Sequence, residues 1–288
     1  MAVENGARCD SFNKQGQTPL HVLCTHGLAE EVERWRQMQR SAEAHAAQVE
    51  GADVDNEAEE EANALHIASD VVDLFMSHGV QLSAQTFTGE TALHLAITRA
   101  GEAATQASSS HALLSTVPSA TEAAAATREA ATEASAIARE AEALVVALVG
   151  AGAPLHMRNC RGLSPLDLAQ MFDDDATKAA GSSAAETSVA HAQGTTLPGR
   201  SHGLVVSLLR HVSHAPPWVP DENVQRCESL HCAKLFSVTA RRHHCRHCGR
   251  VICGACSGRK MALPQLGRSR RVRVCQLCWS VLNFRKLT

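Results

Sequence analysis

Eight of the eleven cysteines in this sequence fall into four closely spaced pairs near its C-terminal end. The pairs are Cys227 with Cys232, Cys245 with Cys248, Cys253 with Cys256, and Cys275 with Cys278. Two thiolates a few residues apart can bind the same Zn²⁺, which takes four ligands in a tetrahedron. Four pairs therefore predict two zinc ions in closed structural sites, which leave no coordination position for a substrate.

The loops between consecutive pairs predict how the pairs share the two ions. These loops contain 12, 4 and 18 residues. Four residues are too few for the second and third pairs to close comfortably around one ion. We therefore expect cross-braced sites, with Cys227, Cys232, Cys253 and Cys256 at site one and Cys245, Cys248, Cys275 and Cys278 at site two. A module this small must draw most of its folding free energy from the metal, about 10 kcal/mol or more per site.

A basic segment, residues 241–249, surrounds the second cysteine pair. Its sequence, Arg-Arg-His-His-Cys-Arg-His-Cys-Gly, contains three arginines and three histidines. The arginine guanidinium is planar, always charged, and matches phosphate oxygens with two parallel hydrogen bonds. Histidine, with a reference pKa of about 6.5, can add positive charge in slightly acidic solution. The segment, held rigid by zinc, is a candidate binding site for a phosphorylated ligand.

Charge is divided unevenly along the chain, although the net charge is only −3. Residues 221–288 carry 14 Lys/Arg and 3 Asp/Glu, whereas the remainder carries 13 and 27. With eight thiolates and two Zn²⁺ included, the C-terminal region keeps a net charge of +7. A basic region on an acidic body predicts a polyanionic partner, either a membrane surface or nucleic acid.

Neither a signal peptide nor a membrane-spanning segment is predicted. The first six residues lack the pattern of a charged start followed by an apolar run. The longest apolar run, around residues 143–155, is shorter than the roughly 20 residues that span a bilayer, and it contains glycine and proline. We expect a cytoplasmic protein, in which paired cysteines bind metal rather than form disulfides. No catalytic motif is present, so we expect no enzyme.

A short motif recurs in the N-terminal two thirds of the chain. Clear copies lie at residues 13–24, 86–96 and 159–169, and a weaker one at 63–68. In each clear copy a glycine suits a turn, Thr or Ser can cap a helix, and proline fits the first helical turn in two of the three. The motif resembles the ankyrin repeat, with its Thr-Pro-Leu-His signature. The resemblance implies a mainly α ankyrin-repeat solenoid of four units over residues 13–212, which would bind a protein partner.

The spacing of the copies departs from the ankyrin period of about 33 residues. Their leucines, Leu20, Leu65, Leu93 and Leu166, are 45, 28 and 73 residues apart. We therefore expect inserts: an exposed, partly helical one at about 101–141, and a disordered one at about 173–201. The second helices of the units are expected near 28–39, 71–78, 144–153 and 204–210. Residues 1–12 are expected to be a disordered start, and 213–217, with two prolines, a stiff linker.

The C-terminal module resembles the FYVE zinc finger over about residues 218–285. The resemblance lies in Trp-x-x-Asp at 218–221, the basic segment, and Arg-Val-Cys at 273–275. It implies a small zinc-stabilised α+β module that binds phosphatidylinositol 3-phosphate on early endosomal membranes. The residues implied to contact the headgroup are Asp221, Arg241, Arg242, His243, His244, Arg246 and Arg273. The loop before the basic segment would dip into the bilayer with Val238 and Thr239, and these small side chains predict shallow insertion.

One departure from the FYVE pattern concerns the first cysteine pair. Four residues separate Cys227 from Cys232, where the family has two. Cys232 keeps the expected distance to Cys245, so Cys227 is the ligand in question. His231 is a possible substitute, although two adjacent ligands on one ion are geometrically awkward.

Two classes of function follow from these features. The first is a peripheral membrane adaptor that binds phosphatidylinositol 3-phosphate through the two-zinc finger and a protein through ankyrin repeats, in endosomal membrane trafficking. The alternative is a RING-like ubiquitin-ligase subunit whose ankyrin repeats bind substrate. The Trp-x-x-Asp motif and the basic segment favour the adaptor, because a RING needs a hydrophobic surface for its partner enzyme. A nucleic-acid partner is not expected, since the module has few aromatic residues on which bases could stack.

Overall fold

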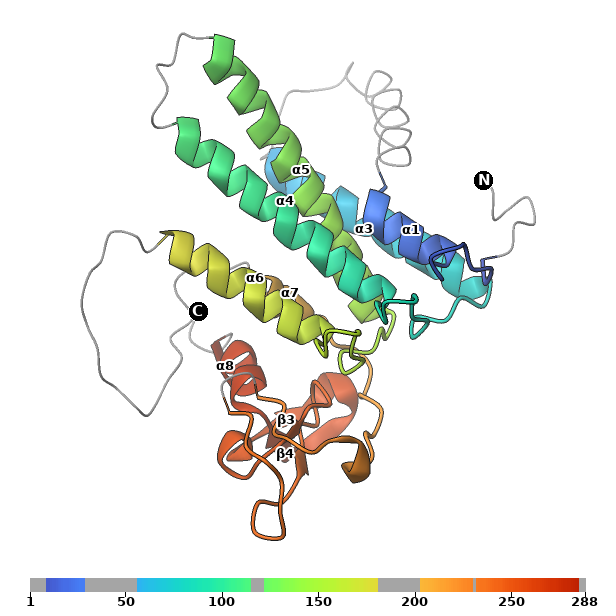
Figure 1. Ribbon diagram of the computed structural model, residues 1–288, viewed down its shortest axis with the longest axis vertical. Coiled ribbons are helices and arrows are strands. Elements are labelled where there is room, and N and C mark those ends of the chain that lie inside the picture. The colour runs from blue at the N-terminus through green and yellow to red at the C-terminus, as the bar shows by residue number, and fades with distance from the viewer. Residues whose placement is uncertain (1–8, 29–55, 115–121, 181–202, 230–231, 285–288) are drawn as a thin grey trace. The chain divides into compact units, whose positions relative to one another are not determined.

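The computed structural model describes residues 9–28, 56–114, 122–180, 203–229 and 232–284. The chain divides into two compact units, residues 1–148 and 149–288. Both contain helices, and the second also holds two small sheets (Figure 1). None of the helices in the described ranges is long and apolar enough to cross a membrane.

Three copies of one local structure follow the recurring sequence motif. In each, a tight turn closes on a glycine with φ of 71 to 75°, a conformation that disfavours other residues. A helix begins three residues later, and a side chain three residues after the capping Thr or Ser hydrogen-bonds back to that capping residue. The three copies have glycines Gly16, Gly89 and Gly162, helices α1 (Pro19–His26), α4 (Ala92–Leu114) and α6 (Pro165–Ala180), and cap pairs Thr18–His21, Thr91–His94 and Ser164–Asp167.

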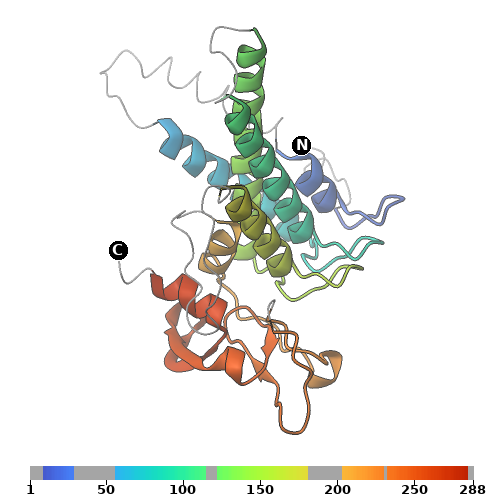
Figure 2. The ribbon, with the colours of Figure 1, turned by 60° about the vertical axis from the view of Figure 1, so that its left-hand side comes forward.

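The first two copies pack against each other within the first unit. The His21 side chain, on α1, is buried. Its Nε2 atom lies 3.1 and 3.2 Å from the carbonyl oxygens of Ala84 and Glu90. The Phe87 N–H donates to the Gln15 carbonyl, which joins the loops that precede α1 and α4 (Figure 2). The recurring histidine of the first copy thus links two neighbouring loops by hydrogen bonds.

The weak copy of the motif does not form a turn followed by a helix. Residues 63–68 lie inside α3 (Asn56–Ser77), a single helix of 22 residues. Residues 56–62, which directly precede them, are rich in Glu and Ala, which favour helix, and contain no glycine to make a turn. The prediction of a separate second unit beginning here was therefore wrong. The helix expected at 71–78 is the end of α3, and Gly79 follows it at φ 78°.

The expected insert at 101–141 is helical in its described part, as predicted, but it is not exposed throughout. Its described part extends α4 to Leu114 and forms most of α5 (Glu122–Gly150). Alanines on these two long helices are buried, because a side chain this small lets helices approach closely; they include Ala103, Ala107, Ala124, Ala131, Ala134 and Ala141. The prediction of exposure was wrong for these alanines, because it equated a lack of large apolar residues with exposure.

Other predictions fall partly outside the described residues. These are the start before residue 9, most of the helix expected at 28–39, and the insert from 181 to 201. Within the described part, Cys9 is buried rather than in a disordered start. The second insert also begins differently, because residues 173–180 continue α6.

The second unit begins with the end of α5 and joins a helix pair to the cysteine-rich module. Helix α7 (Leu204–Arg210) packs on α6, and the Asp173 carboxylate accepts hydrogen bonds from the N–H groups of Leu204 and Val205 at 3.0 Å. In the module, β1 (His243–His244) pairs antiparallel with β2 (Val251–Ile252), and β3 (Arg259–Leu263) with β4 (Arg268–Val274). Helix α8 (Gln276–Phe284) closes it, and three short 3₁₀ turns lie at Asp221–Asn223, Ala255–Ser257 and Pro264–Leu266.

Candidate metal centres and basic strand

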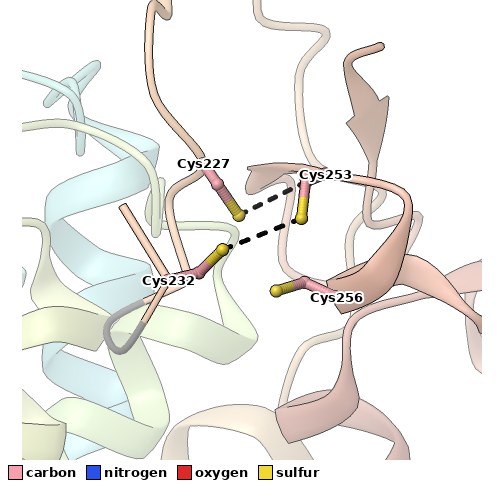
Figure 3. Close-up of side chains that lie close together, drawn as sticks. All are labelled: Cys227, Cys232, Cys253 and Cys256. Atoms are coloured by element: carbon pink, nitrogen blue, oxygen red, sulfur yellow. Dashed lines mark hydrogen bonds between the residues drawn. The ribbon is translucent and has the colours of Figure 1, made fainter. Parts of the chain in front are cut away.

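The first candidate metal centre lies between a loop and the end of β2 (Figure 3). The Sγ atoms of Cys227, Cys232, Cys253 and Cys256 all lie within 4.8 Å of one another. A bridge between Arg226 and Leu235, with the Cys227 N–H donating to the Lys234 carbonyl at 2.8 Å, closes the loop that carries the first two cysteines. The Cys253 N–H donates to the Cys227 Sγ at 3.3 Å, which partly offsets the rise that burial causes in the pKa of Cys227.

The second candidate centre is more deeply buried and joins the segment after β1 to the start of α8. The Sγ atoms of Cys245, Cys248, Cys275 and Cys278 also lie within 4.8 Å of one another. The backbone N–H groups of Cys275 and Cys278 donate to the sulfurs of Cys245 and Cys275 at 3.2 and 3.3 Å. The two sets of four are those that the loop lengths predicted, with alternate pairs sharing a centre.

Four thiolates that converge in this way suit Zn²⁺ and supply the charge that it needs. The cysteines of site one differ in how readily each loses its proton. Burial raises the pKa of Cys253, but hydrogen bonds from Cys256 and the other cysteines of site one outweigh burial and lower it to about 7. Burial raises the pKa values of Cys227 and Cys256, so metal binding must displace the protons of these two thiols. All four positions around each ion are filled by protein, so zinc here stabilises the fold.

The wide spacing of the first cysteine pair has a structural explanation. Glu228, which follows Cys227, accepts a hydrogen bond from the Val251 N–H at 2.6 Å and ties the widened loop to β2. Cys227 is buried with its sulfur in the cluster. The alternative ligand, His231, lies outside the described residues.

The basic segment runs along β1, and its side chains are held by neighbours. Trp218 stacks on the His244 ring with centroids 3.7 Å apart, and the Arg246 guanidinium lies 4.8 Å from the Trp218 ring. The His244 Nε2 lies 2.8 Å from the Val219 carbonyl and 3.9 Å from an Asp221 oxygen. The Trp-x-x-Asp motif therefore orients the second histidine of the segment.

Arg242 and Arg273 are also anchored. The Arg242 Nε donates to the Val224 carbonyl at 2.8 Å, and its guanidinium lies 5.0 Å from the Phe236 ring. Arg273 on β4 donates to the Ser257 Oγ at 2.8 Å, and its carbonyl accepts a hydrogen bond from the Arg246 N–H at 2.9 Å. These contacts place Arg246 and Arg273 on adjacent backbone segments.

The positive charges of this cluster affect the pKa of His243. Burial lowers its pKa, and Arg273, Arg241 and His244 lower it further. The groups predicted from β1 and β4 therefore share one positive region. Such a region can bind an anion, and the bound anion would in turn raise the pKa of His243.

The loop before the basic segment exposes the residue expected to meet a membrane. Val238 is 92% exposed. The loop is closed by a hydrogen bond from the Ser237 N–H to the Ala240 carbonyl at 3.1 Å, and the Ser237 and Thr239 hydroxyls lie 3.1 Å apart. An apolar side chain at the tip of a closed turn suits shallow contact with a lipid surface.

Sequence reasoning missed three residues of this module. Ser257 orients Arg273, Glu228 fixes the widened loop, and Arg250 is buried with its charge paired. The unusual cysteine spacing was a signal for Glu228. Ser257 and Arg250 lie beside cysteines, but nothing in their types distinguished them.

Comparison with known proteins identifies this module. Residues 217–284 match the family model of the FYVE zinc finger. Over 62 residues, 22% of this chain, the sequence is 48% identical to the Lateral signaling target protein 2 homolog of Brugia malayi. Over 81 residues, 28% of the chain, it is 38% identical to Rabankyrin-5 of Mus musculus.

These similarities are confined to a small part of each relative, 10% of the first and 6% of the second. Among solved structures, the LM5-1 FYVE domain from Leishmania major is 42% identical and covers 23% of this chain and 77% of its own, with a TM-score of 0.22. The VHS and FYVE tandem domains of Hrs are 18% identical to this chain. The match covers 81% of this chain and 99% of the Hrs chain, with a TM-score of 0.23. The C-terminal module of this chain is thus a FYVE zinc finger domain that binds two zinc ions.

Proposed function

We propose that this chain is a non-catalytic adaptor that binds phosphatidylinositol 3-phosphate in early endosomal membranes through its FYVE domain. The proposed headgroup ligands are Arg241, Arg242, His243, His244, Arg246 and Arg273, with Asp221 near the histidines, and the zinc ligands are the eight paired cysteines.

The observation that carries this proposal is the anchoring of arginines from two strands beside a pair of histidines. Arg246 and Arg273 are each held by a neighbouring side chain, so they lose little rotamer freedom on binding a phosphate. Guanidinium groups fixed in this way favour an ordered phosphate over diffuse negative charge. Val238 at the tip of the adjacent loop supports binding at a membrane surface.

The helical region would supply the second half of the adaptor. The repeated turn, cap and helix around Gly16, Gly89 and Gly162 support an ankyrin-like region within residues 13–212. The similarity to Rabankyrin-5, whose name refers to ankyrin, is consistent with this proposal. We propose that this region binds a protein and brings it to the endosomal membrane.

Vesicle co-sedimentation of the zinc-loaded full chain tests the lipid proposal. The vesicles carry one phosphoinositide each, across the singly and doubly phosphorylated forms. We expect selective binding to phosphatidylinositol 3-phosphate, and a loss of about tenfold or more in Arg246→Ala, because the lost hydrogen bonds are to a charged group. Arg268→Ala is the matched control, since it removes the same charge from the exposed far end of β4.

Two results would count against the proposal. Equal binding to all anionic vesicles would indicate that the basic segment acts only through net charge. Equal losses in Arg246→Ala and Arg268→Ala would indicate the same. The ubiquitin-ligase alternative would then be tested next, by assaying ubiquitin transfer with a panel of conjugating enzymes.

A further inference from the structure

Arg250 is the most deeply buried charged residue of the FYVE domain, at 4% exposed, and its charge is paired outside the domain. Its Nη2 donates to the Asp167 Oδ1 at 2.6 Å, and its Nη1 to the Gln170 Oε1 at 2.9 Å. Both acceptors lie on α6, and Asp167 is itself only 6% exposed. A buried guanidinium needs such partners, because an unpaired charge in this setting is strongly destabilising.

Asp167 stands at the position where the other two copies of the motif have histidine. In those copies, His21 and His94 hydrogen-bond to the capping threonine at the start of their helices. Here one oxygen of Asp167 performs the same cap, accepting from the Ser164 N–H at 3.0 Å and the Ser164 hydroxyl at 2.8 Å. The other oxygen binds Arg250. Aspartate therefore keeps the cap that histidine provides and adds a negative charge that faces the zinc finger.

A second connection joins the same helix start to the other zinc centre. Arg158 donates through Nη1 to Asp167 at 3.2 Å and through Nη2 to Glu228 at 2.8 Å. Glu228 adjoins the zinc ligand Cys227 and also binds the Val251 N–H. The charges alternate along Arg250, Asp167, Arg158 and Glu228. Arg250, at one end of this series, lies two residues after Cys248 of site two. Glu228, at the other end, follows Cys227 of site one.

We propose that α6 and the loop before it, residues 156–170, are a docking surface for the chain's own zinc finger. The domain is then not a freely tethered module: it forms one folded body with α6 and α7, and α7 also packs on α8. The lipid-binding strand is held in a fixed orientation to these helices. This face of α6 is occupied, so a protein partner of the helical region binds elsewhere. The inference does not depend on which lipid the domain binds.

Hydrogen–deuterium exchange on the zinc-loaded full chain tests this inference, with Asp167→His as the main variant. Histidine at this position reproduces the cap of the other copies, so α6 is expected to stay helical while Arg250 loses its partner. We expect exchange in residues 249–252 to rise by about a hundredfold, since removing one partner leaves a buried charge unpaired. Asp175→Asn is the matched control: it removes one negative charge from an exposed site on the same helix.

A double-mutant cycle provides the second measurement. If Arg250→Gln and Asp167→His act through one contact, the double variant will be no less protected than the worse single variant. A cycle of Arg158→Gln and Glu228→Gln reports on the second connection and decides the question if Asp167→His fails to fold. Unchanged exchange in Asp167→His, an equal rise in Asp175→Asn, or additive effects in both cycles would overturn the inference.

Discussion

At the scale of single residues, Ser257 holds one of the proposed phosphate-binding arginines, Arg273, in position. Ser257 is buried at the 3₁₀ turn after β2, and its hydroxyl both accepts from Arg273 at 2.8 Å and donates to the Gly254 carbonyl at 3.2 Å. Arg273 is thereby held before any ligand arrives. Because an arginine side chain loses about 2 kcal/mol of rotamer freedom when it is fixed, this restraint should favour binding.

We predict that Ser257→Ala weakens binding to vesicles containing phosphatidylinositol 3-phosphate by about threefold to tenfold, as expected for the loss of one hydrogen bond. The variant should keep its zinc, since Ser257 is not a ligand in either cluster. Co-sedimentation combined with measurement of bound zinc checks both statements. A variant that binds like wild type would show that Arg273 is not ordered by Ser257 in the complex.

His21 provides a pH-dependent contribution in the first unit. Burial lowers its pKa below the usual 6.5, and hydrogen bonds to the Glu90 and Ala84 carbonyls offset this only in part. Below about pH 6.5 the unfolded chain therefore binds a proton that the folded chain does not. The stability contributed by neutral His21 is complete above that pH and is lost as the pH falls.

Lowering the pH from 7.5 to 5.5 should lower the urea midpoint of the full chain. We predict that this decrease is smaller in His21→Asn than in wild type. The comparison uses the pH difference, because the variant also loses hydrogen bonds and is less stable at both values. An equal pH difference in wild type and His21→Asn would contradict the assignment.

At the scale of elements, the long helices α4 and α5 depend on small side chains. Ala134 is 2% exposed although its segment contains almost no large apolar residue. We predict that Ala134→Leu destabilises the chain by about 1 to 3 kcal/mol through overpacking. Ala123→Leu makes the same change at an exposed position of the same helix and should be nearly neutral. Thermal unfolding of both variants distinguishes a packed α5 from the exposed insert that the sequence had suggested.

The sequence predicted those elements whose signals are local. Gly16, Gly89 and Gly162 mark turns, and the Thr or Ser that follows marks the start of a helix, so α1, α4 and α6 could be located. The partition of eight cysteines into two centres followed from loop lengths alone. The signals failed where packing decides the outcome, because a buried alanine seam and an exposed alanine-rich helix have the same composition.

Pairing between distant residues could not be predicted for a related reason. Asp167 differs from the histidine of the other copies, and this difference was visible in the sequence. Its partner was not, since Arg250 is 83 residues away and is one of fourteen basic residues in the C-terminal region. Only the folded chain identifies which of these charges is buried.

At the scale of the whole molecule, charge and geometry make separable contributions to membrane binding. Residues 221–288 carry a net +11 before metal is counted, and the rest of the chain carries −14. The long-range attraction of the basic region to any anionic surface is screened by salt, because the Debye length falls from about 30 Å at 0.01 M to about 3 Å at 1 M. Contacts between anchored arginines and one phosphate group act at shorter range and are screened less.

We therefore predict two different responses to salt. Binding of the zinc-loaded full chain to vesicles that contain only phosphatidylserine as the anionic lipid should fall by more than about tenfold between roughly 0.05 and 0.5 M salt. Binding to vesicles that also contain phosphatidylinositol 3-phosphate should fall only a few-fold, and Arg246→Ala should restore the steep response. If both kinds of vesicle lose binding equally in wild type, the basic region acts as a diffuse charge, and the anchoring of Arg246 and Arg273 has no role in recognition.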